Sequence, residues 1–288
     1  MLGYISGESA ALQMFRRVPV ARNQVRFPIL SALPVAYWVT GDTGLKQTSE
    51  AAWTNKYLNI EELAIIVPVP ENVASDLDGS GIDVWAEIKP AVQEAMARAL
   101  DDAIFFGTNA PASFPDDVSA AAAAAGNTNA EGAIATAGGF HEDVDELIGL
   151  VEADGYDVNG IVAARSAKGK FRRARDGDGN RLAGLNSDLT EYDGLKIAYP
   201  MRGLFPGTVR LFVGDWTEFV IGVRQDISYK LLDQAVIQDD TGAIVYNLAQ
   251  QDMVAGRFTF RAGWQVSNRI NRDEPTEANR YPAGRLTY

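Results

Sequence analysis

Alternating hydrophobic and polar residues near the end of the chain predict a long β-strand. In residues 253–266, MVAGRFTFRAGWQV, one face collects Val254, Phe258, Phe260, Ala262, Trp264 and Val266. A period of two over this length indicates a strand with one buried face and one face in water. We expect it to pair with residues 63–69, LAIIVPV, where branched apolar residues predict a short buried strand and Pro68 favours a sheet edge or strand end.

The strongest helical pattern covers residues 81–106. Apolar residues recur at helical spacing at Ile82, Trp85, Ile88, Val92, Ala95, Met96, Ala99 and Ala103. Ser80 and Asp83 suit the N-terminal cap, and Gly107 is placed to end the helix. A helix of this length spans roughly 39 Å. Pro90 is expected to kink or divide it.

A second region follows a segment rich in alanine and glycine, residues 108–139, which is typical of a flexible link. An amphipathic helix is predicted over 141–155, a short strand at GIVAA and a short helix at SAKGKFRRAR. Later strands are predicted at LKIAY, VRLFVGDW, EFVIGV and ISYKLL. The tail INRDEPTEANRYPAGRLTY is polar and is expected on the surface. Mixed helices and strands indicate an α+β or α/β protein.

Residues 34–62 have the pattern of a projecting hairpin. VAYWVT and AAWTNKYLNI flank the turn residues GDTG, and the segment carries Tyr37, Trp38, Trp53 and Tyr57. Ten residues of strand reach about 33 Å. An isolated two-stranded hairpin is only marginally stable in water, so these aromatic rings need another surface to cover them.

Residues 1–30 contain Pro19 and Pro28 and no sustained period, which predicts an extended arm. The arm has a net charge of +3, because Glu8 offsets one of its four arginines, Arg16, Arg17, Arg22 and Arg26. It is either a solubilising tail or an ordered strap that docks on an acidic neighbour.

Composition limits the classes of function. The chain has 288 residues, 47% hydrophobic and 22% charged, which is an ordinary globular composition with room for two subdomains. No apolar run approaches the ~18 residues that span a bilayer, and no secretory signal is expected. The net charge of −12 disfavours a general nucleic-acid binder. With no cysteine, disulfides and thiol catalysis are excluded.

The sequence shows no convincing catalytic or metal site. His141 is the only histidine and is expected at the surface or in a helix cap. Asp176, Asp178 and Asn180 alternate as in an EF-hand loop, but Arg181 and Ser187 stand where that loop needs Gly and Glu. Acidic pairs such as Asp101–Asp102 and Asp116–Asp117 are typical of solvated acids or caps. Neither a phosphate loop nor a nucleophile elbow occurs. We therefore expect no catalytic residue, no bound metal and no cofactor.

Residues 168–175, KGKFRRAR, concentrate positive charge and include Arg172 and Arg173. They form either a solvated helix face or a contact with acidic residues of a neighbouring copy. RNA binding is a weaker alternative, since the rest of the chain is acidic.

The ordered phrases of the chain resemble the tailed-bacteriophage major capsid proteins, whose shell fold is shared with encapsulins and the herpesvirus capsid floor. Residues 61–111 resemble the family's strand, proline turn, aspartate and spine helix, which closes with AIFFG at 103–107. FRRARDGDGNRL, VGDWTEFVIGVRQDISYKLL and DMVAGRFTFRAGWQV resemble later phrases. The resemblance covers residues 1–270 in order.

The resemblance implies an α+β shell fold in five parts. These are an N-terminal arm (1–33), an extended E-loop hairpin (34–62), a peripheral subdomain with the spine helix (63–124), an axial subdomain (125–244), and a return to the peripheral subdomain with a C-terminal tail (245–288). It implies a structural, non-enzymatic protein that self-assembles through pentamers and hexamers into an icosahedral shell around double-stranded DNA. Assembly would occur in the cytoplasm of the host bacterium.

The resemblance also implies partners and contact residues. Candidate contacts between subunits are Tyr37, Trp38, Lys46, Trp53, Lys56, Tyr57, Arg172 and Arg173, with the four arm arginines. Residues 1–33 leave no room for the long scaffolding domain of some relatives, so a separate scaffolding protein, or none, is implied, besides portal and decoration proteins. Some relatives crosslink a hairpin lysine to an asparagine of a neighbouring copy. Lys46 and Lys56 lie in the hairpin here and Asn247 precedes the closing strand, but we favour noncovalent locking. An acidic wall should touch packaged DNA only weakly.

Two alternatives differ in what they predict. An encapsulin-like nanocompartment shares the fold and encloses protein cargo. An enzyme of unrecognised type predicts a deep pocket with convergent perturbed acids or bases, in a monomer or small oligomer.

Overall fold

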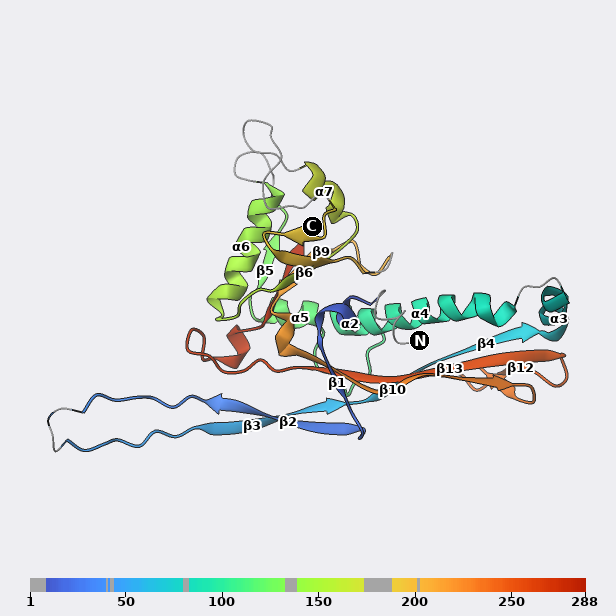
Figure 1. Cartoon of the computed structure of the whole chain (residues 1–288), viewed down its shortest axis with the longest axis horizontal. Coiled ribbons are helices and arrows are strands. Elements are labelled where there is room, and N and C mark those ends of the chain that lie inside the picture. Colours follow the sequence, from blue (N-terminus) through green and yellow to red (C-terminus); the bar gives the residue numbers. More distant parts are fainter. Residues whose placement is uncertain are drawn as a thin grey trace.

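A long four-stranded sheet, with a helix lying along it, forms the base of the molecule (Figure 1). The structure is a computed structural model that describes residues 9–39, 41, 44–79, 83–132, 139–173, 188–200 and 203–288. In spatial order the sheet contains β1 (Arg16–Pro19), β10 (Phe219–Leu232), β13 (Met253–Val266) and β4 (Glu61–Pro70). A two-stranded ribbon, β11 (Val236–Gln238) and β12 (Ile244–Asn247), continues it at one end (Figure 1).

The predicted pairing of the late strand with the early one is confirmed, since β13 and β4 are antiparallel neighbours. The even-numbered residues of β13 from Phe258 to Val266 are buried, as the alternation predicts. Val254, expected on the same face, is only half-buried. Strand β4 is an edge strand, as Pro68 suggests, but it is not buried as expected. Only one of its faces meets the rest of the molecule, so its residues alternate between half-buried and exposed over much of its length.

The predicted long helix is α4, Val84–Phe106. Asp83 caps its start by accepting a hydrogen bond from the Trp85 amide at 2.9 Å. Gly107 ends it in the left-handed conformation, with φ 65°. The helix continues through Pro90, so of the two expected effects, a kink or a division, the division does not occur. Ser80 and Ile82 lie outside the described residues.

Strand β10 corrects two expectations. It is one strand where two were predicted, with irregular pairing between Val223 and Gln225 and between Gln225 and Ser228. It also pairs with β13 in the basal sheet, although residues up to 244 were expected in the second region. The alternation breaks at these irregularities, which is why the sequence reads as two shorter strands.

The second part of the molecule stands on the base and is built around a six-stranded sheet (Figure 1). Its strands in spatial order are β5 (Thr128–Ala130), β14 (Ala283–Thr287), β9 (Val209–Gly214), β6 (Gly160–Ala163), β8 (Leu195–Ala198) and β7 (Glu191–Tyr192). Helices α6 (Phe140–Ala153) and α7 (Ala167–Arg173) belong to this part, as predicted. Three further short helices of the described chain are α3 (Glu71–Gly79), which follows β4 in the base, η1 (Trp216–Glu218) and η2 (Glu277–Asn279).

The expected flexible link contains ordered structure. Helix α5, Val118–Ala124, begins where Asp117 accepts a hydrogen bond from the Ala120 amide at 2.9 Å. Val118 and Ala122 are completely buried. An alanine-rich helix shows little hydrophobic periodicity, so its sequence resembles a linker, and its burial depends on the elements around it.

The polar tail lies on the surface only in its first half, where residues 275–279 are exposed. Strand β14 lies between β5 and β9, and both Ala283 and Leu286 are fully buried. The end of the described chain therefore lies within the upright part, whereas the expected division placed residues 245–288 with the base and a tail.

The N-terminal arm also has regular structure where none was expected. Helix α2, Ala10–Met14, is followed by β1, which adds to the basal sheet parallel to β10. Strand β2, Gln24–Ala32, then pairs with β3, Ala52–Asn59. Pro28 is tolerated in β2 because a two-stranded ribbon has free edges on both sides.

One hydrophobic core joins the base to the upright part. It contains Phe105 of α4, Phe212 of β9, Trp216, and Phe258 and Trp264 of β13, all at most 1% exposed. A second core around α6 fills the upright part alone. The shared core holds the base and the upright part in a fixed relation.

Candidate assembly surface

The feature that stands out from the body is the hairpin of β2 and β3, whose arms run on as extended chain to a distant tip (Figure 1). We call residues 24–59 the finger. The expected strand at 35–40 is absent from the described residues, and the first paired strand is β2 instead. Beyond Ala32 the arms are no longer a ladder, although the Val35 amide donates to Ser49 Oγ at 2.7 Å.

A glycine pair fixes the base of the finger on the sheet. Gly222 of β10 and Gly263 of β13 are register partners. A Cβ on Gly263 would lie 1.8 Å from the carbonyl oxygen of Asn59, and one on Gly222 would lie 2.5 Å from Leu58 Cδ2. Only glycine allows the finger to cross the sheet this closely. Gln265 Nε2 also donates to the Tyr57 carbonyl at 2.9 Å.

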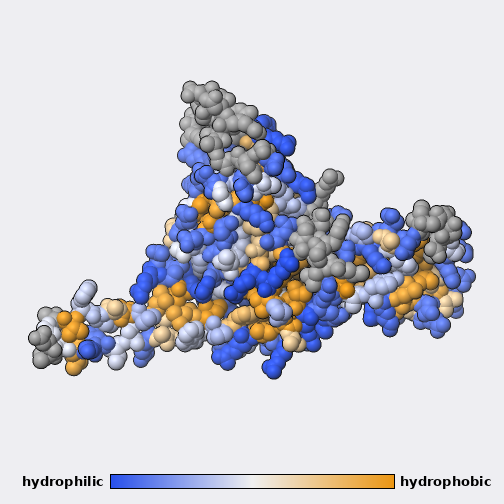
Figure 2. Space-filling view, viewed as in Figure 1, coloured by the Kyte–Doolittle hydropathy of each residue, from blue (hydrophilic) through white to orange (hydrophobic). Residues whose placement is uncertain are grey.

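Beyond its base the finger is covered by little of its own chain. Trp38 is 102% exposed and Leu45 90% exposed. Trp53, Tyr37 and Tyr57 are exposed to 66%, 52% and 46%. Figure 2 shows hydrophobic residues interspersed with more polar ones along this projection. Side chains of this size in water are typical of an interaction surface.

The lysines of the finger differ in their surroundings. Lys46 is exposed. Lys56 instead forms an ion pair with Glu277 of its own chain, with Nζ and Oε1 3.0 Å apart. Asn247 ends β12, at the opposite end of the molecule from the finger (Figure 1). A bond from a finger lysine to Asn247 would therefore have to join two copies.

The arm arginines are dispersed over separate sites. Arg17 donates from both Nε and Nη2 to the Leu12 carbonyl, with Nε at 2.9 Å. Arg26 Nε donates to Asn55 Oδ1 across the finger at 2.6 Å. Arg16 and Arg22 are exposed. From residue 9 on, the arm is therefore an ordered strap along its own subunit, and Arg16 and Arg22 on it are exposed.

A buried carboxylate holds the start of this strap. Asp101 of α4 accepts hydrogen bonds from Ser9 Oγ at 2.6 Å, from the Ala10 amide at 2.8 Å and from the Ala11 amide at 3.2 Å. Burial raises the pKa of Asp101 to about 7, although the three hydrogen bonds act against it. The expectation that Asp101 is a solvated acid is wrong, because the residue is only 1% exposed.

The basic run on α7 is partly neutralised within the chain. Lys170 pairs with Glu131, which also accepts a hydrogen bond from Arg210 Nη2 at 2.8 Å. Burial acts to raise the pKa of Glu131, but these two cations outweigh it and hold the pKa below its usual range. Arg172 and Arg173 remain exposed on the last turn of α7. The segment 175–182, where the EF-hand match fails, lies outside the described residues.

His141 is buried, not at the surface or in a cap as expected. It is the second residue of α6, and its ring packs edge-on against Phe171 and Tyr192. Burial lowers its pKa, so the ring is neutral at pH 7. Within the described ranges, no group of three or more His, Asp or Glu side chains is placed to hold a metal ion, and no helix is a candidate membrane span.

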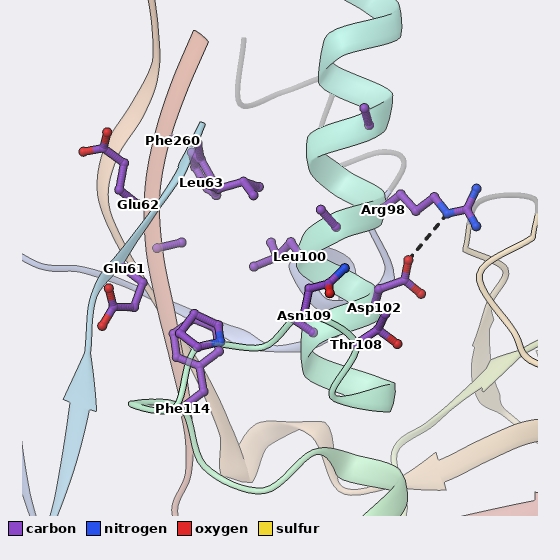
Figure 3. Close-up of a pocket in the computed structure, with 15 residues that line it drawn as sticks. Glu61, Glu62, Leu63, Arg98, Leu100, Asp102, Thr108, Asn109, Phe114 and Phe260 are labelled. Carbon is purple, nitrogen blue, oxygen red and sulfur yellow. Dashed lines mark ion pairs between the residues drawn. The ribbon is translucent and has the colours of Figure 1, made fainter. Parts of the chain in front are cut away.

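A groove of about 440 Å³ lies between α4, β4 and the loop that follows α4. Figure 3 shows Leu63, Leu100 and Phe260 pointing into it, with the Arg98–Asp102 ion pair on the helix. Its walls are largely apolar, and no set of convergent acids and bases of the kind an enzyme needs is seen along the described lining.

A second exposed apolar surface was missed from the sequence. Its exposed apolar residues lie on β10 and on both faces of the ribbon at the end away from the finger, and they are Leu231, Val236, Ile244 and Val245. Branched residues on either side of the turn residues Asp239–Gly242 are a hairpin signal that could have identified it.

Known proteins of similar sequence and shape are consistent with this geometry. The model of the phage capsid family matches residues 2–269. A solved structure from Microbacterium phage Oxtober96 is 37% identical, with a TM-score of 0.83, over 97% of this chain and 91% of that chain. One from Mycobacterium phage Bobi is 30% identical, with a TM-score of 0.83, over 97% and 90% of the two chains.

A more distant structure is described as "Capsid of native GTA particle computed with C5 symmetry". It is 18% identical, with a TM-score of 0.63 over 96% of this chain and 88% of that chain, and it shows likeness of fold alone. Among curated proteins the comparison finds no match.

Proposed function

The chain belongs to the phage capsid family and is a structural major capsid protein of the virion, and on this premise we propose that it closes into an icosahedral shell through pentamers and hexamers. The shell encloses double-stranded DNA and assembles in the cytoplasm of the host bacterium. The observation that carries the proposal is the finger, whose Trp38 and Trp53 are exposed and need a neighbouring copy to cover them.

The finger suits assembly by many equal contacts. Burial of an aromatic side chain contributes about 25 cal/mol per Å², before the costs of association. Each subunit gives one finger and receives one, so a closed ring satisfies every copy and the contacts reinforce one another. We favour noncovalent locking over a crosslink from Lys46 or Lys56 to Asn247.

The charge of the chain indicates how it contacts its other partners. The chain carries a net charge of −12, so the shell wall makes only weak, nonspecific contact with packaged DNA. Arg16, Arg22, Arg172 and Arg173 are exposed cations suited to acidic surfaces of a neighbouring copy or of a separate scaffolding protein. Portal and decoration proteins complete the proposed set of partners. An encapsulin-like compartment is not favoured, because the matched family is that of phage capsids.

The experiment is electron microscopy of the purified protein, with and without a co-expressed scaffold. We expect hollow polyhedra from the wild type. Trp53→Ala should leave the subunit folded but remove about 2 kcal/mol per contact, which raises the critical concentration for assembly roughly 30-fold.

The matched control is Trp53→Phe, which keeps most of the apolar area and should keep assembly close to wild type. A wild-type protein that stays monomeric under all assembly conditions would contradict the shell. A Trp53→Ala variant that unfolds, with contacts between copies intact, would contradict the role of the finger.

A further inference from the structure

Helix α2 of the arm lies where the upright part meets the base (Figure 1). It contacts α4 of the base and β8 of the upright sheet. Ala10, Ala11 and Leu12 are at most 1% exposed and belong to the core that the two parts share. A helix of five residues is not stable in water by itself, so its order depends on the parts packed against it. The helix therefore forms a wedge between the base and the upright part.

Phe15, which follows the last residue of α2, fills the joint between the two parts. The centre of its ring lies 4.9 Å from that of Phe219 at the start of β10 and 6.0 Å from that of Phe105 on α4, both in the base. The ring also stacks at 5.7 Å on Trp216. The indole Nε1 of Trp216 donates to the Gly160 carbonyl of the upright sheet at 2.9 Å. Removing this one ring would therefore open a cavity at the joint.

Met14 connects the wedge to the upright sheet, whereas the next strand of the arm connects it to the base. A Cβ on Gly160 of β6 would collide with Met14 Cε, so the methionine lies directly over this glycine. Beyond Phe15 the arm continues as β1, which pairs with β10 in the basal sheet. Because β1 holds the arm on the base, α2 can leave the joint while the arm stays attached to the subunit.

Asp101 is the group of this joint whose charge can change. Its hydrogen bonds from Ser9 and from two amides of α2 fix the first turn of the wedge. The charged groups next to it on α4 are Asp102, which disfavours its ionisation, and Arg98, which is paired with Asp102 at 3.5 Å. Among the described residues, none of the ion pairs involves Asp101. An ionised Asp101 therefore has no paired cation to offset the cost of its burial.

We propose that α2 is a releasable wedge, which fixes the angle between the base and the upright part while Asp101 is protonated and leaves the joint when Asp101 ionises. Leaving the joint returns the carboxylate to water, where its charged form is stable, so ionisation favours the released state. Burial raises the pKa of Asp101 to about 7 in the docked state, which places the change near neutral pH. The wedge acts within a single subunit, so it does not depend on the proposed assembly into a shell.

Hydrogen exchange of the unassembled subunit tests the release. After correction for the intrinsic pH dependence of exchange, the protection of the amides in residues 10–15 should fall at least tenfold between pH 5 and pH 8. Helix α6 should keep its protection. In Asp101→Asn, which cannot ionise, the protection of residues 10–15 should be independent of pH. Glu94→Gln, an exposed change on the same helix, is the matched control and should show the wild-type fall.

A distance measurement tests the angle between the two parts. The wild-type chain has no cysteine, so Glu94→Cys on α4 and Glu152→Cys on α6 place one spin label on each part at exposed positions. We expect a narrow distribution of label distances at pH 5 and a broader or displaced one at pH 8. Phe15→Ala should give the broader or displaced distribution at both pH values, whereas Phe15→Leu should respond to pH as the wild type does. If Phe15→Ala does not fold, the wild type and Asp101→Asn at the two pH values decide.

The outcomes separate the wedge from the proposed function. Unchanged protection of residues 10–15 between pH 5 and pH 8, or an equal fall in Asp101→Asn, overturns the role of Asp101. Loss of protection over the whole chain at pH 8 overturns local release, because it reports global unfolding. Release of α2 with an unchanged distance distribution overturns its action on the angle. All of these measurements use the single subunit, whereas only a failure of the wild type to form shells overturns the proposed function.

Discussion

At the residue scale, the most informative group is Asp101, a carboxylate buried near the C-terminal end of the long helix α4. Its oxygens receive three hydrogen bonds from the first turn of α2 and from Ser9. Removing the carboxylate would leave buried donors without a partner, each costing about 1–3 kcal/mol. The sequence could not predict this role, because an acid beside Asp102 on a helix has the pattern of a solvated face, and its partners lie some ninety residues away.

The pH dependence of stability tests this residue. The pKa of Asp101 is about 7 in the folded protein and ~3.9 in an unfolded chain, so folding takes up a proton between these values. Its contribution to stability is complete below about pH 4 and is lost as the pH rises through about 7. Relative to Asp101→Asn, the wild-type free energy of unfolding should fall by roughly 2–4 kcal/mol between pH 4 and pH 8.

Urea unfolding of the unassembled subunit at both pH values measures this difference. Glu94→Gln, an exposed change on the same helix, is the control and should follow the wild-type profile. If the free energies of unfolding of the wild type and of Asp101→Asn change by the same amount between pH 4 and pH 8, Asp101 does not titrate in this range.

At the scale of elements, the sequence predicted those helices and strands whose hydrophobic residues recur with a regular period. The helix before Gly107, the helix before Gly155 and the strand at 253–266 all show their period in one segment. Strand β14 escaped prediction because AGRLT is short and mixed, and its burial comes from β5 and β9 on either side. Of the candidate contacts, the exposed aromatics were found from composition, whereas the groove of β4 arises from distant segments and has no local signal.

The crossing of the finger over Gly222 and Gly263 decides where the finger points. Gly263→Ala would place a Cβ 1.8 Å from the Asn59 carbonyl oxygen, which must displace backbone. We expect a loss of about 1–3 kcal/mol in stability, faster proteolysis within the finger and poorer assembly. Denaturant unfolding and limited proteolysis measure these effects.

Gly149→Ala, in helix α6 with nothing within 4 Å of the added Cβ, is the matched control and should gain up to about 1 kcal/mol. If Gly263→Ala unfolds and is cleaved like the wild type, the close crossing does not hold the finger in place.

At the scale of the whole molecule, two different apolar surfaces lie at opposite ends of the base. The finger is at one end, and Leu231, Val236, Ile244 and Val245 are at the other. Figure 2 shows hydrophobic residues at both ends. When two different surfaces of a subunit bind each other, the subunits associate head to tail. Such contacts give a closed ring when repeating the rotation from one copy to the next returns to the first copy. The shared core around Trp216 and Trp264 joins the base to the upright part within each subunit.

Assembly should therefore depend on salt in a definite direction. A net charge of −12 makes copies repel each other. The screening length falls from about 30 Å at 0.01 M salt to about 10 Å at 0.1 M. We expect the critical concentration for assembly, measured by light scattering, to fall at least twofold over this range, whereas sucrose at equal osmolarity should not reproduce the fall. A rise with salt would mean that contacts between opposite charges dominate the interfaces.

The position of β14 has a consequence for the order in which the protein is made. Residues 283–287 lie between β5 and β9, yet ribosomes synthesise them after both. A nascent chain can therefore build its base before its upright sheet, whose two flanking strands stay unjoined until translation has passed this segment.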